Sequence, residues 1–500
     1  GSVPRPRLRF GGSVVEGGGL VAPRRLVGGT DESVLQPRWS PDGRLFFVSD
    51  RSGWWNLYQL PAGRLEEAAA ADAAAVWPLE AEFGRPAWNF GQATYGFSDG
   101  GLVCTYRRAG VDRVALLRPL SGDPPRYEAT DLDLPFTVCE QLVAAGNRFA
   151  ILAAASDRPA AVVTCAVESD APDQSAESRP LLRQTVLCQS FDLAALGIDP
   201  AYVSQPQAIT FPTTEGDEAH ALFYAPRHPT VLGLASERPP LIVVSHGGPT
   251  SNALAACNLS LQYWTTRGFA VVDVDYRGSP GYGRAYRNRL RGNWGLFDVD
   301  DCVAAAAWLA AQGKVDAART AIRGGSAGGF TTLAALTMRD AFQAGASYYG
   351  VSDLEALARD THKFESRYLD GLVGPYPEQR QRYRDRSPID HVDGLSCPVI
   401  FLQGLEDHVV PPDQAERMFQ ALQHKGVATE LLEFPGEGHG FRMAASIRRA
   451  TEAEYAFYAR VFGFSPVFGV ATTQTEAVRG SAGDDEKGES AAAAAAEDPS

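Results

Sequence analysis

The sequence predicts an α/β protein with a mainly parallel, doubly wound sheet in its C-terminal half, preceded by an all-β region. Three observations support this fold class. From about residue 205, short apolar runs alternate with amphipathic helical patterns, and such alternation gives parallel strands joined by right-handed crossovers. Residues 30–200 contain β-prone runs separated by turn signals. A glycine-rich turn, RGGSAGGF at 323–330, lies between a strand candidate and a helix candidate.

The all-β region repeats one unit, a turn followed by a β-prone run, a second turn and a second run. The units recur at a spacing of roughly 50 residues and are clearest at 37–60, 86–119 and 141–167. Recurrence of this kind is typical of propeller blades more than of a sandwich. We therefore expect a β-propeller-like region before the α/β domain.

These changes of pattern divide the chain into four regions. We expect an N-terminal segment at 1–29 that could belong to a blade, the propeller-like region at 30–200, the α/β domain at 201–465 and a low-complexity tail at 466–500. The tail ends in GSAGDDEKGESAAAAAAEDPS. It has too little apolar content to fold, so we expect it to be disordered.

The α/β domain begins with a hairpin candidate at 208–227. Buried strand candidates follow at 240–248, 269–278, 320–324, 345–350, 398–404 and 429–435, and amphipathic helix candidates at 298–313 and 412–426. In such a sheet, catalytic residues are expected in the loops at the carboxyl ends of the strands.

The composition excludes several classes of partner. The formal net charge of −14 disfavours nucleic acid, because phosphate contacts need a basic surface. No apolar run is long enough to span a membrane. The seven cysteines are scattered without a C-x-x-C pair, which argues against a metal site or a disulfide framework and for a reducing compartment.

The N-terminus carries little information on location. The chain starts with Gly1, and the first ten residues include three arginines but no long apolar core, so they do not form an intact secretory signal. These arginines would suit the end of a transit segment, whereas a cloning scar or fragment boundary explains them equally well. We expect a cytoplasmic protein or one in an organelle interior such as a plastid stroma, and not a secreted one.

Ser326 is the first candidate catalytic residue. The turn around it has the G-x-S-x-G spacing, with Gly324 and Gly328 two residues away on either side. In a nucleophile elbow the serine backbone is strained, and only small neighbours let strand and helix pass closely. A flexible linker has a similar composition, but the apolar flanks favour the elbow.

The partners of a serine nucleophile are a base and an orienting acid, expected in the chain order serine, acid, histidine. Asp407 follows the strand candidate at 398–404, and His439 lies in a glycine-rich loop after the candidate at 429–435. A single histidine in a loop is more often a surface residue. The agreement of chain order, strand position and loop chemistry favours the catalytic interpretation.

An oxyanion hole requires two backbone N–H groups. We expect one from Ala327, the residue after the nucleophile, and the other from Gly248 in the turn HGGP, with Gly247 as its neighbour. A tight turn without function is the alternative for HGGP. Tyr282 and Tyr349 could line a substrate pocket, although packing in the core explains them equally well.

Six motifs together resemble a known family: HGGP, YRGSPGYGRAYR, NWGLFDVDD, GGSAGGF, QGLEDHVVPP and FPGEGHGF. In this order they are similar to the prolyl oligopeptidase family of serine peptidases, nearest its acylaminoacyl-peptidase and dipeptidyl-aminopeptidase-like branch. The resemblance is strong over about 200–465 and weak back to residue 30. It implies an α/β-hydrolase domain preceded by a β-propeller that restricts access to short peptides.

The resemblance carries over specific roles. Ser326 is implied as nucleophile, Asp407 as acid and His439 as base, with the Ala327 and Gly248 amides as oxyanion hole. The chain departs from the family in two respects. The 200 or so N-terminal residues are few for a family propeller, so this region could be incomplete. Some members also place an arginine two residues after the acid, where this chain has Val409.

Three functions remain open from the sequence. The first is a serine peptidase acting on short aminoacyl or N-acyl-aminoacyl peptides. The second is a carboxylesterase or lipase-like hydrolase with the same triad, and the third is a non-catalytic propeller scaffold. We expect no cofactor and no metal. The expected partners are short peptides, with no membrane partner, and a homo-oligomer is possible.

Overall fold

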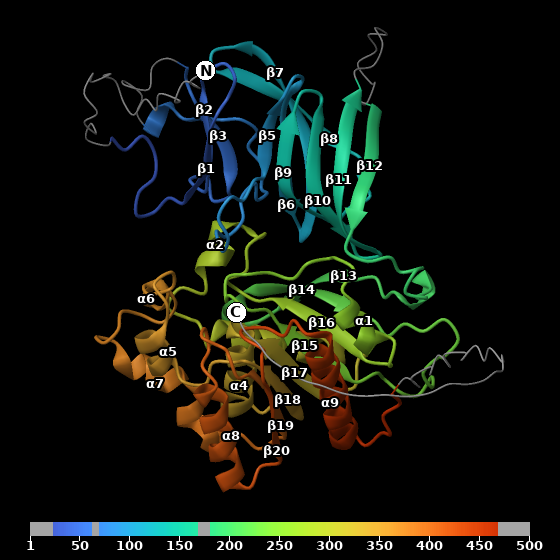
Figure 1. Cartoon of the computed structure of the whole chain (residues 1–500). Helices are drawn as coiled ribbons and strands as arrows, with labels where there is room; N and C mark the ends of the chain where they lie inside the picture. Colours follow the sequence, from blue (N-terminus) through green and yellow to red (C-terminus); the bar gives the residue numbers. More distant parts are fainter. Residues whose placement is uncertain (1–23, 63–69, 169–180, 469–500) are drawn as a thin grey trace, which may run out of the picture.

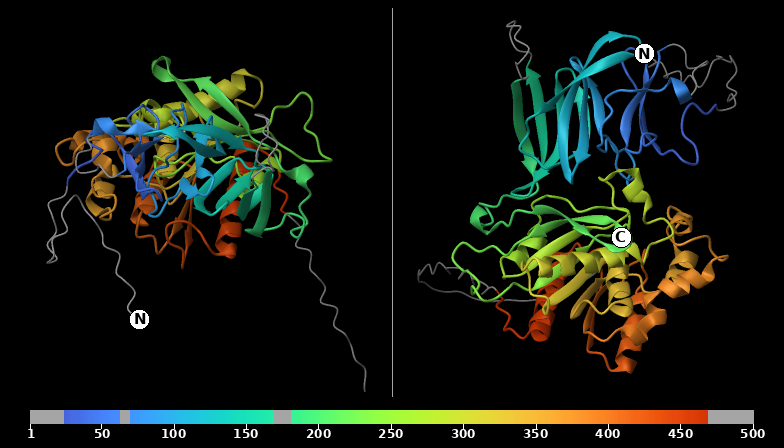
Figure 2. Two further views of the ribbon diagram at one scale, coloured as in Figure 1. Left: turned by 90° about the horizontal axis from the view of Figure 1, so that it is seen from above. Right: turned by 180° about the vertical axis from the view of Figure 1, so that it is seen from behind.

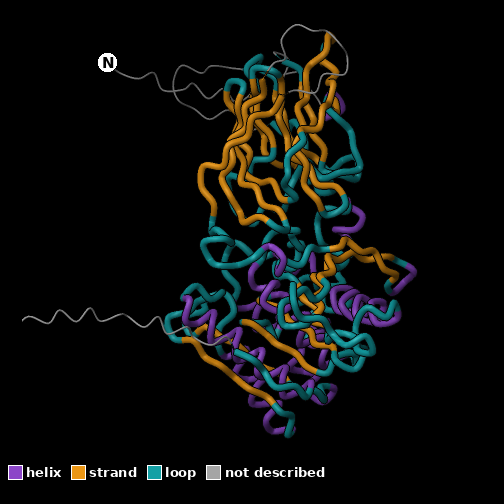
Figure 3. Tube along the Cα trace, turned by 90° about the vertical axis from the view of Figure 1, so that its right-hand side faces the viewer, coloured by secondary structure: helices purple, strands orange, loops and turns teal. Residues whose placement is uncertain are grey.

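A computed structural model of the chain describes residues 24–62, 70–168 and 181–468, which form two bodies (Figure 1). The N-terminal body consists of antiparallel sheets, and the C-terminal body is built around one large sheet. Helices are concentrated in the C-terminal body (Figure 3). Residues 1–23 and 469–500, which include most of the expected N-terminal segment and tail, lie outside the described residues.

Three four-stranded antiparallel sheets make up the described N-terminal body. Their strands pair in chain order within each sheet: β1 (Val34–Trp39), β2 (Leu45–Ser49), β3 (Asn56–Leu60) and β4 (Ala74–Ala75); β5 (Tyr95–Ser98), β6 (Gly101–Arg108), β7 (Val111–Gly122) and β8 (Pro125–Leu132); β9 (Val138–Ala145), β10 (Arg148–Ala155), β11 (Arg158–Glu168) and β12 (Leu181–Gln189).

The three sheets stack on one another as blades do (Figure 2). Successive residues of a strand point to opposite faces, and β6 uses both. Leu102 and Cys104 are buried in a core shared with the first sheet, where Phe46 and Phe97 meet with ring centroids 5.1 Å apart. Val103 points the other way, into a core shared with the third sheet. The second sheet is therefore apolar on both faces.

The C-terminal body contains one eight-stranded sheet in the order β13-β14-β16-β15-β17-β18-β19-β20. Strands β13 and β14 form the expected hairpin, β14 pairs antiparallel with β16, and the remaining pairs are parallel. The strands are β13 (Gln207–Pro212), β14 (Glu218–Tyr224), β15 (Leu241–Ser245), β16 (Ala270–Asp275), β17 (Thr320–Gly325), β18 (Ala344–Tyr348), β19 (Val399–Gly404) and β20 (Thr429–Phe434).

Helices cover both faces of this sheet. One face packs against α3, α4 and α8, and the other against α1 and α9 (Figure 1). The helices are α1 (Leu259–Thr265), α2 (Gly283–Asn288), α3 (Phe297–Ala311), α4 (Ala327–Met338), α5 (Leu354–Asp360), α6 (Tyr368–Leu372), α7 (Arg380–Arg386), α8 (Asp413–Lys425) and α9 (Ala444–Phe462). Short 3₁₀ turns lie at Ala70–Asp72, Pro200–Tyr202, Thr214–Gly216 and Pro388–Gly394.

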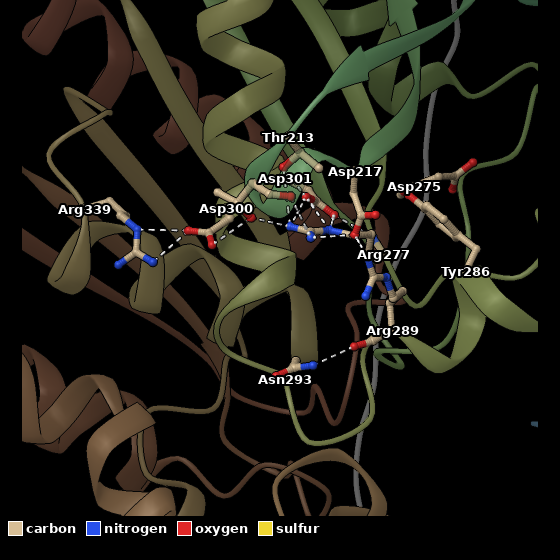
Figure 4. A network of polar contacts seen from close by, with 11 residues as sticks. Thr213, Asp217, Asp275, Arg277, Tyr286, Arg289, Asn293, Asp300, Asp301 and Arg339 are labelled. Carbon is tan, nitrogen blue, oxygen red and sulfur yellow. Dashed lines mark hydrogen bonds and ion pairs between the residues drawn. The ribbon is translucent and has the colours of Figure 1, made fainter.

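A buried arginine ties the hairpin to the rest of the sheet domain (Figure 4). The guanidinium of Arg277 pairs with Asp301 of α3 at 2.8 Å and with Asp217 at 3.2 Å, and it donates to the Thr214 hydroxyl at 2.7 Å. The guanidinium carbon of Arg277 lies 3.9 Å from the centroid of the Phe297 ring. The carboxylates compensate a charge that burial alone would disfavour, so this network fixes the turn between β13 and β14.

The two bodies meet at helix α2 (Figure 1). Arg287 of α2 pairs with Asp50 at 2.6 Å and with Glu82 at 3.4 Å, and its guanidinium lies 3.7 Å from the Trp55 ring centroid. The N–H of Gly283 also donates to Glu82. Burial raises the pKa of the Glu82 carboxyl. Helix α2 therefore inserts a charged side chain into the N-terminal body.

No described helix is long and apolar enough to cross a membrane. The expected strand and helix candidates of the α/β domain each coincide with an element of the structure, within a few residues. The division of the chain into four regions stays a prediction.

Candidate active site

Ser326 occupies the junction between β17 and α4. Its backbone angles, φ 57° and ψ −122°, are rare for a residue other than glycine. The Ser326 N–H donates to the Tyr348 carbonyl, and the Phe330 N–H donates to the Ser326 carbonyl, both at 3.0 Å. These bonds hold the serine at the tip of a sharp turn at the carboxyl end of β17, the geometry of a nucleophile elbow.

Close packing explains the glycines around the serine. A Cβ atom on Gly324 would lie 2.4 Å from the carbonyl group of Gly328, and one on Gly328 would lie 2.1 Å from the carbonyl oxygen of Ser245 in β15. Both distances are far below van der Waals contact. The start of α4 therefore approaches β15 so closely that only glycine fits, which a flexible linker would not require.

Asp407 and His439 form a hydrogen-bonded pair. Nδ1 of His439 lies 2.8 Å from Oδ2 of Asp407, and Asp407 is 2% exposed. Its other oxygen, Oδ1, accepts hydrogen bonds from the N–H groups of Val409 and Val410 at 2.8 and 2.9 Å. The carboxylate is thus fixed by three bonds. With Nδ1–H donating to it, the imidazole presents Nε2 as a proton acceptor.

The loops that carry the acid and the histidine are joined to each other. The N–H of Leu405 donates to the Phe434 carbonyl at 3.1 Å, and the N–H of Glu406 donates to the Glu437 carbonyl at 2.9 Å. The strands before these loops, β19 and β20, run parallel. The two loops therefore leave the same edge of the sheet as the serine turn does.

Tyr349 lies between the serine turn and His439. Its ring centroid is 4.9 Å from that of His439, and a Cβ atom on Gly325 would lie 2.9 Å from Tyr349 Cε2. The backbone of Tyr349 has a φ of 38°, a strained value for a tyrosine. The structure thus brings Tyr349 to the candidate site.

The HGGP turn lies beside the serine. A Cβ atom on Gly247 would be 3.7 Å from Ser326 Cβ, and Gly248 has a φ of 114°, which favours glycine. Ala327 is the first residue of α4, so its N–H has no carbonyl partner within the helix. Ala327 and the HGGP turn are therefore neighbours of the nucleophile candidate.

The side chain of His246, the first residue of the HGGP motif, makes contacts that hold this turn in place. Its Nε2 lies 2.7 Å from the Ser279 hydroxyl, and its ring stacks on Tyr276 with centroids 4.1 Å apart. Tyr276 in turn donates to the Pro249 carbonyl at 2.8 Å. Burial lowers the pKa of His246 to about 4, so its imidazole is neutral at neutral pH and the turn carries no titrating charge there.

Tyr282 makes packing and hydrogen-bond contacts within the protein, which is one of the two alternatives that the sequence left open. Its hydroxyl donates to Oδ2 of Asp275 at 2.7 Å, and its ring stacks on His220 with centroids 4.0 Å apart. Burial raises the pKa of Tyr282 well above the usual tyrosine value. The Tyr282 hydroxyl is bonded to Asp275 and one face of its ring is covered by His220, which weighs against a place for Tyr282 in a substrate pocket.

A cavity of about 390 Å³ lies between the two bodies, against the HGGP turn. The C-terminal body contributes Gly247, Gly248 and Asn252, and the N-terminal body contributes polar and aromatic side chains, namely Arg85, Trp88, Gln92, Glu140 and Gln141. Arg85 pairs with Glu140 at 2.8 Å. The sequence analysis missed these residues, because they come from separate loops and strands whose meeting no local pattern signals.

Residues 256–465 match the profile of the prolyl oligopeptidase family. This part of the chain is similar to the prolyl oligopeptidase family. The resemblance seen in the six motifs is thereby confirmed.

Among relatives in the prolyl oligopeptidase family, the chain is 30% identical over 237 residues to a dipeptidyl aminopeptidase BIII of Pseudoxanthomonas mexicana, covering 46% of this chain and 34% of that protein. It is 32% identical over 211 residues to the acylamino-acid-releasing enzyme of Arabidopsis thaliana, covering 40% and 27% respectively. The chain thus spans about a third of the length of these relatives or less.

A solved structure, that of a Mycobacterium tuberculosis puromycin-hydrolyzing peptidase, is similar over 89% of this chain and 64% of its own, with 41% identity and a TM-score of 0.80. This similarity extends over both bodies. The expected fold class, an α/β-hydrolase domain preceded by β-propeller sheets, is confirmed.

Proposed function

We propose that the chain is a serine peptidase that hydrolyses short aminoacyl or N-acyl-aminoacyl peptides through an acyl-enzyme. The observation that supports this most directly is the bond of 2.8 Å between His439 and the buried Asp407, at the same sheet edge as the strained Ser326. The relatives' names, which include peptidases and acylamino-acid-releasing enzymes, favour a peptide substrate.

In the proposed first step, Nε2 of His439 takes the proton from the Ser326 hydroxyl as Oγ attacks the substrate carbonyl carbon. The resulting imidazolium is stabilised by the Asp407 carboxylate. The N–H groups of Ala327 and Gly248 bind the oxyanion that develops on the carbonyl oxygen. Both are backbone groups held by packing, so little reorganisation is needed as the charge appears.

The tetrahedral intermediate then collapses. The bond between the carbonyl carbon and the amide nitrogen breaks, and His439 gives its proton to the departing amine. The acyl group stays on Ser326. In the second half, His439 takes a proton from water, the hydroxide attacks the acyl carbon, and Ser326 leaves with a proton from His439. Acid pH should therefore suppress turnover, because protonated His439 cannot accept a proton.

Substrates are expected to reach the serine through the cavity between the two bodies. Its lining residues Trp88 and Gln92 and the paired Arg85 and Glu140 belong to the N-terminal body. A cavity of about 390 Å³ suits a few residues of peptide and not a folded protein. Short peptides are therefore the proposed substrates.

A panel of chromogenic aminoacyl, N-acyl-aminoacyl and simple ester substrates tests this proposal. For each substrate, kcat/KM is divided by the rate of its uncatalysed hydrolysis. A peptidase should give a larger ratio for the first or second class than for an ester of the same acyl group. Preference for simple esters would favour the carboxylesterase alternative. Covalent labelling by a fluorophosphonate, lost in Ser326→Ala, would exclude a non-catalytic scaffold.

For location, we propose a reducing interior, either the cytoplasm or an organelle. All seven cysteines are free of disulfides, and Cys104, Cys139 and Cys165 are buried in the N-terminal sheets. Burial raises the pKa of the Cys165 thiol to about 11, which keeps it protonated and unreactive. Cell fractionation with an antibody to the chain would test this placement.

A further inference from the structure

A second, larger concavity lies at the opposite edge of the sheet from Ser326. It has a volume of about 1740 Å³, and we call it the basal groove. Its lining includes Pro240, Gly268 and Arg319, which lie one or two residues before β15, β16 and β17 respectively. The basal groove therefore sits at the amino ends of these parallel strands, whereas Ser326 follows the carboxyl end of β17. A six-residue strand spans about 20 Å, so the two sites are separate.

The basal groove is basic in an acidic protein. Its described lining residues include five arginine or lysine side chains and one carboxylate, namely Arg227, Arg238, Arg267, Lys314, Arg319 and Glu237, although the whole chain has a net charge of −14. Such a local excess of one sign attracts a ligand of the opposite sign.

Most of these cations lack an acidic partner. Arg319 pairs with Asp316 at 2.6 Å. Arg227 donates to the Ala201 carbonyl, and the Arg267 guanidinium lies 3.5 Å from the Tyr263 ring centroid. No ion pair of Arg227, Arg238, Arg267 or Lys314 is found within the described residues. Lys314 donates to the side-chain oxygen of Gln207 at 3.2 Å, and Arg267 donates to the Tyr263 carbonyl at 3.0 Å. Neither contact neutralises the charge, so the groove keeps an excess of positive charge that can attract an anionic ligand.

Apolar side chains line the basal groove beside these cations. Leu232 is 89% exposed, Leu234 67% and Val231 62%, and all three belong to the lining. Tyr263 of α1 and Tyr455 of α9 add aromatic surface. Clustered apolar side chains at this exposure are a mark of interaction surfaces.

We propose that the basal groove docks an acidic peptide segment of a partner protein, whose carboxylates face the unpaired arginines and whose apolar side chains cover Leu232 and its neighbours. The volume exceeds that of sites for small ligands, about 300–1,000 Å³. The concave shape fits an extended or helical segment and not a flat membrane surface. This docking site is independent of the proposed peptidase function.

The test uses the full chain with Ser326→Ala, so that the probe is not cleaved. The probe is a fluorescent acidic peptide of about sixteen residues with spaced leucine and phenylalanine side chains, and its control has lysine in place of every acidic residue. Fluorescence anisotropy should show binding of the acidic peptide only. Its affinity should fall about tenfold or more between roughly 50 and 500 mM salt.

Variants locate the binding. Arg227→Glu with Arg238→Glu should weaken binding by about fivefold or more, and Leu232→Ser should weaken it by about threefold or more. The matched controls are Arg148→Glu, an exposed arginine of β10, and Leu120→Ser, 45% exposed in β7. Neither lines the basal groove, so neither should change the affinity.

Three results would overturn the proposal. The first is equal affinity in the groove variants and the controls, which would place the peptide elsewhere, including the cavity beside the HGGP turn. The second is no binding of the acidic peptide up to about 1 mM. The third is that the acidic peptide does not bind, whereas the chain binds phosphatidylserine vesicles and Leu232→Ser abolishes this binding. This result would make the face a membrane-binding surface.

Discussion

The imidazole of His439 donates through Nδ1 to a carboxylate oxygen of Asp407 at 2.8 Å, while the other oxygen of Asp407 is held by the N–H groups of Val409 and Val410. Asp407→Asn keeps the shape and an acceptor but removes the charge. We expect a correctly folded protein whose kcat falls about 10³- to 10⁴-fold, because the imidazolium loses its stabilising partner and the tautomer is no longer fixed. Steady-state kinetics on the best chromogenic substrate, with circular dichroism as the folding control, measures this. Wild-type kcat in the folded variant would remove Asp407 from the mechanism.

Ser326→Ala should abolish hydrolysis, by on the order of 10⁵-fold, without loss of stability. The substitution removes only Oγ, and alanine at a φ of 57° is no more strained than serine. The measurement is kcat/KM in protein free of wild-type contamination, with thermal unfolding alongside. Residual activity that co-purifies with Ser326→Ala at the wild-type level would identify another nucleophile.

Gly328→Ala tests the steric argument for the elbow. Its Cβ would lie 2.1 Å from the Ser245 carbonyl oxygen, so α4 must move away from β15. We expect destabilisation of about 3 kcal/mol or more, together with loss of activity. The control is Gly233→Ala, whose Cβ would meet nothing within 4 Å. Urea unfolding compares the two, and similar midpoints would mean that the helix can shift at little cost.

Arg287 holds the two bodies together. Arg287→Met leaves Glu82, whose side chain is 1% exposed, without its cation, and leaves Asp50, whose side chain is 4% exposed, with only the longer contact to Arg284. We expect a loss of about 3 kcal/mol or more and faster proteolysis between the bodies, within 190–206. The control Arg284→Met removes a longer contact of 3.7 Å to Asp50 and should have a smaller effect. Equal effects of the two substitutions would show that Arg287 has no special role.

The contribution of Asp298 to the free energy of unfolding should fall as pH rises. Burial raises the pKa of Asp298 from 3.8 to about 6, although its oxygens accept hydrogen bonds from the Thr331 hydroxyl and the Gly295 N–H. The folded state therefore binds a proton more tightly than the unfolded state between these two values. The contribution is present below about pH 4 and lost as pH rises through about 6, with a magnitude of about 3 kcal/mol.

The measurement is the difference in unfolding free energy between wild type and Asp298→Asn at several pH values. Asparagine does not titrate, and the contributions of distant titratable groups cancel when the two proteins are compared. The unfolding free energy of Asp298→Asn should therefore rise relative to that of the wild type between pH 4 and about pH 7. A difference that is constant over this range would show that Asp298 has an ordinary affinity for protons in the folded protein.

Local sequence patterns were sufficient to predict strands and helices of the C-terminal body. Alternating strand and helix patterns predicted β15 to β20 and the helices α3 and α8, since the period of apolar residues reflects which face of an element is buried. The spacing of Gly324, Ser326 and Gly328 predicted a steric requirement that the approach of α4 to β15 then explains. Likewise, the loops with Asp407 and His439 follow strands whose direction the pattern implied.

The contacts between distant segments could not be predicted from such local patterns. The insertion of β14 beside β16, antiparallel in an otherwise parallel run, depends on which edge the hairpin reaches. The pairing of Asp50 with Arg287 joins residues 237 positions apart, and Glu140 of the third N-terminal sheet lines the same cavity as Gly247 and Gly248 of the HGGP turn. The hydrogen bond from the Tyr282 hydroxyl to Asp275 is likewise a result of tertiary packing. Local sequence patterns record burial and backbone geometry, but a contact between two loops depends on the folded path of everything between them.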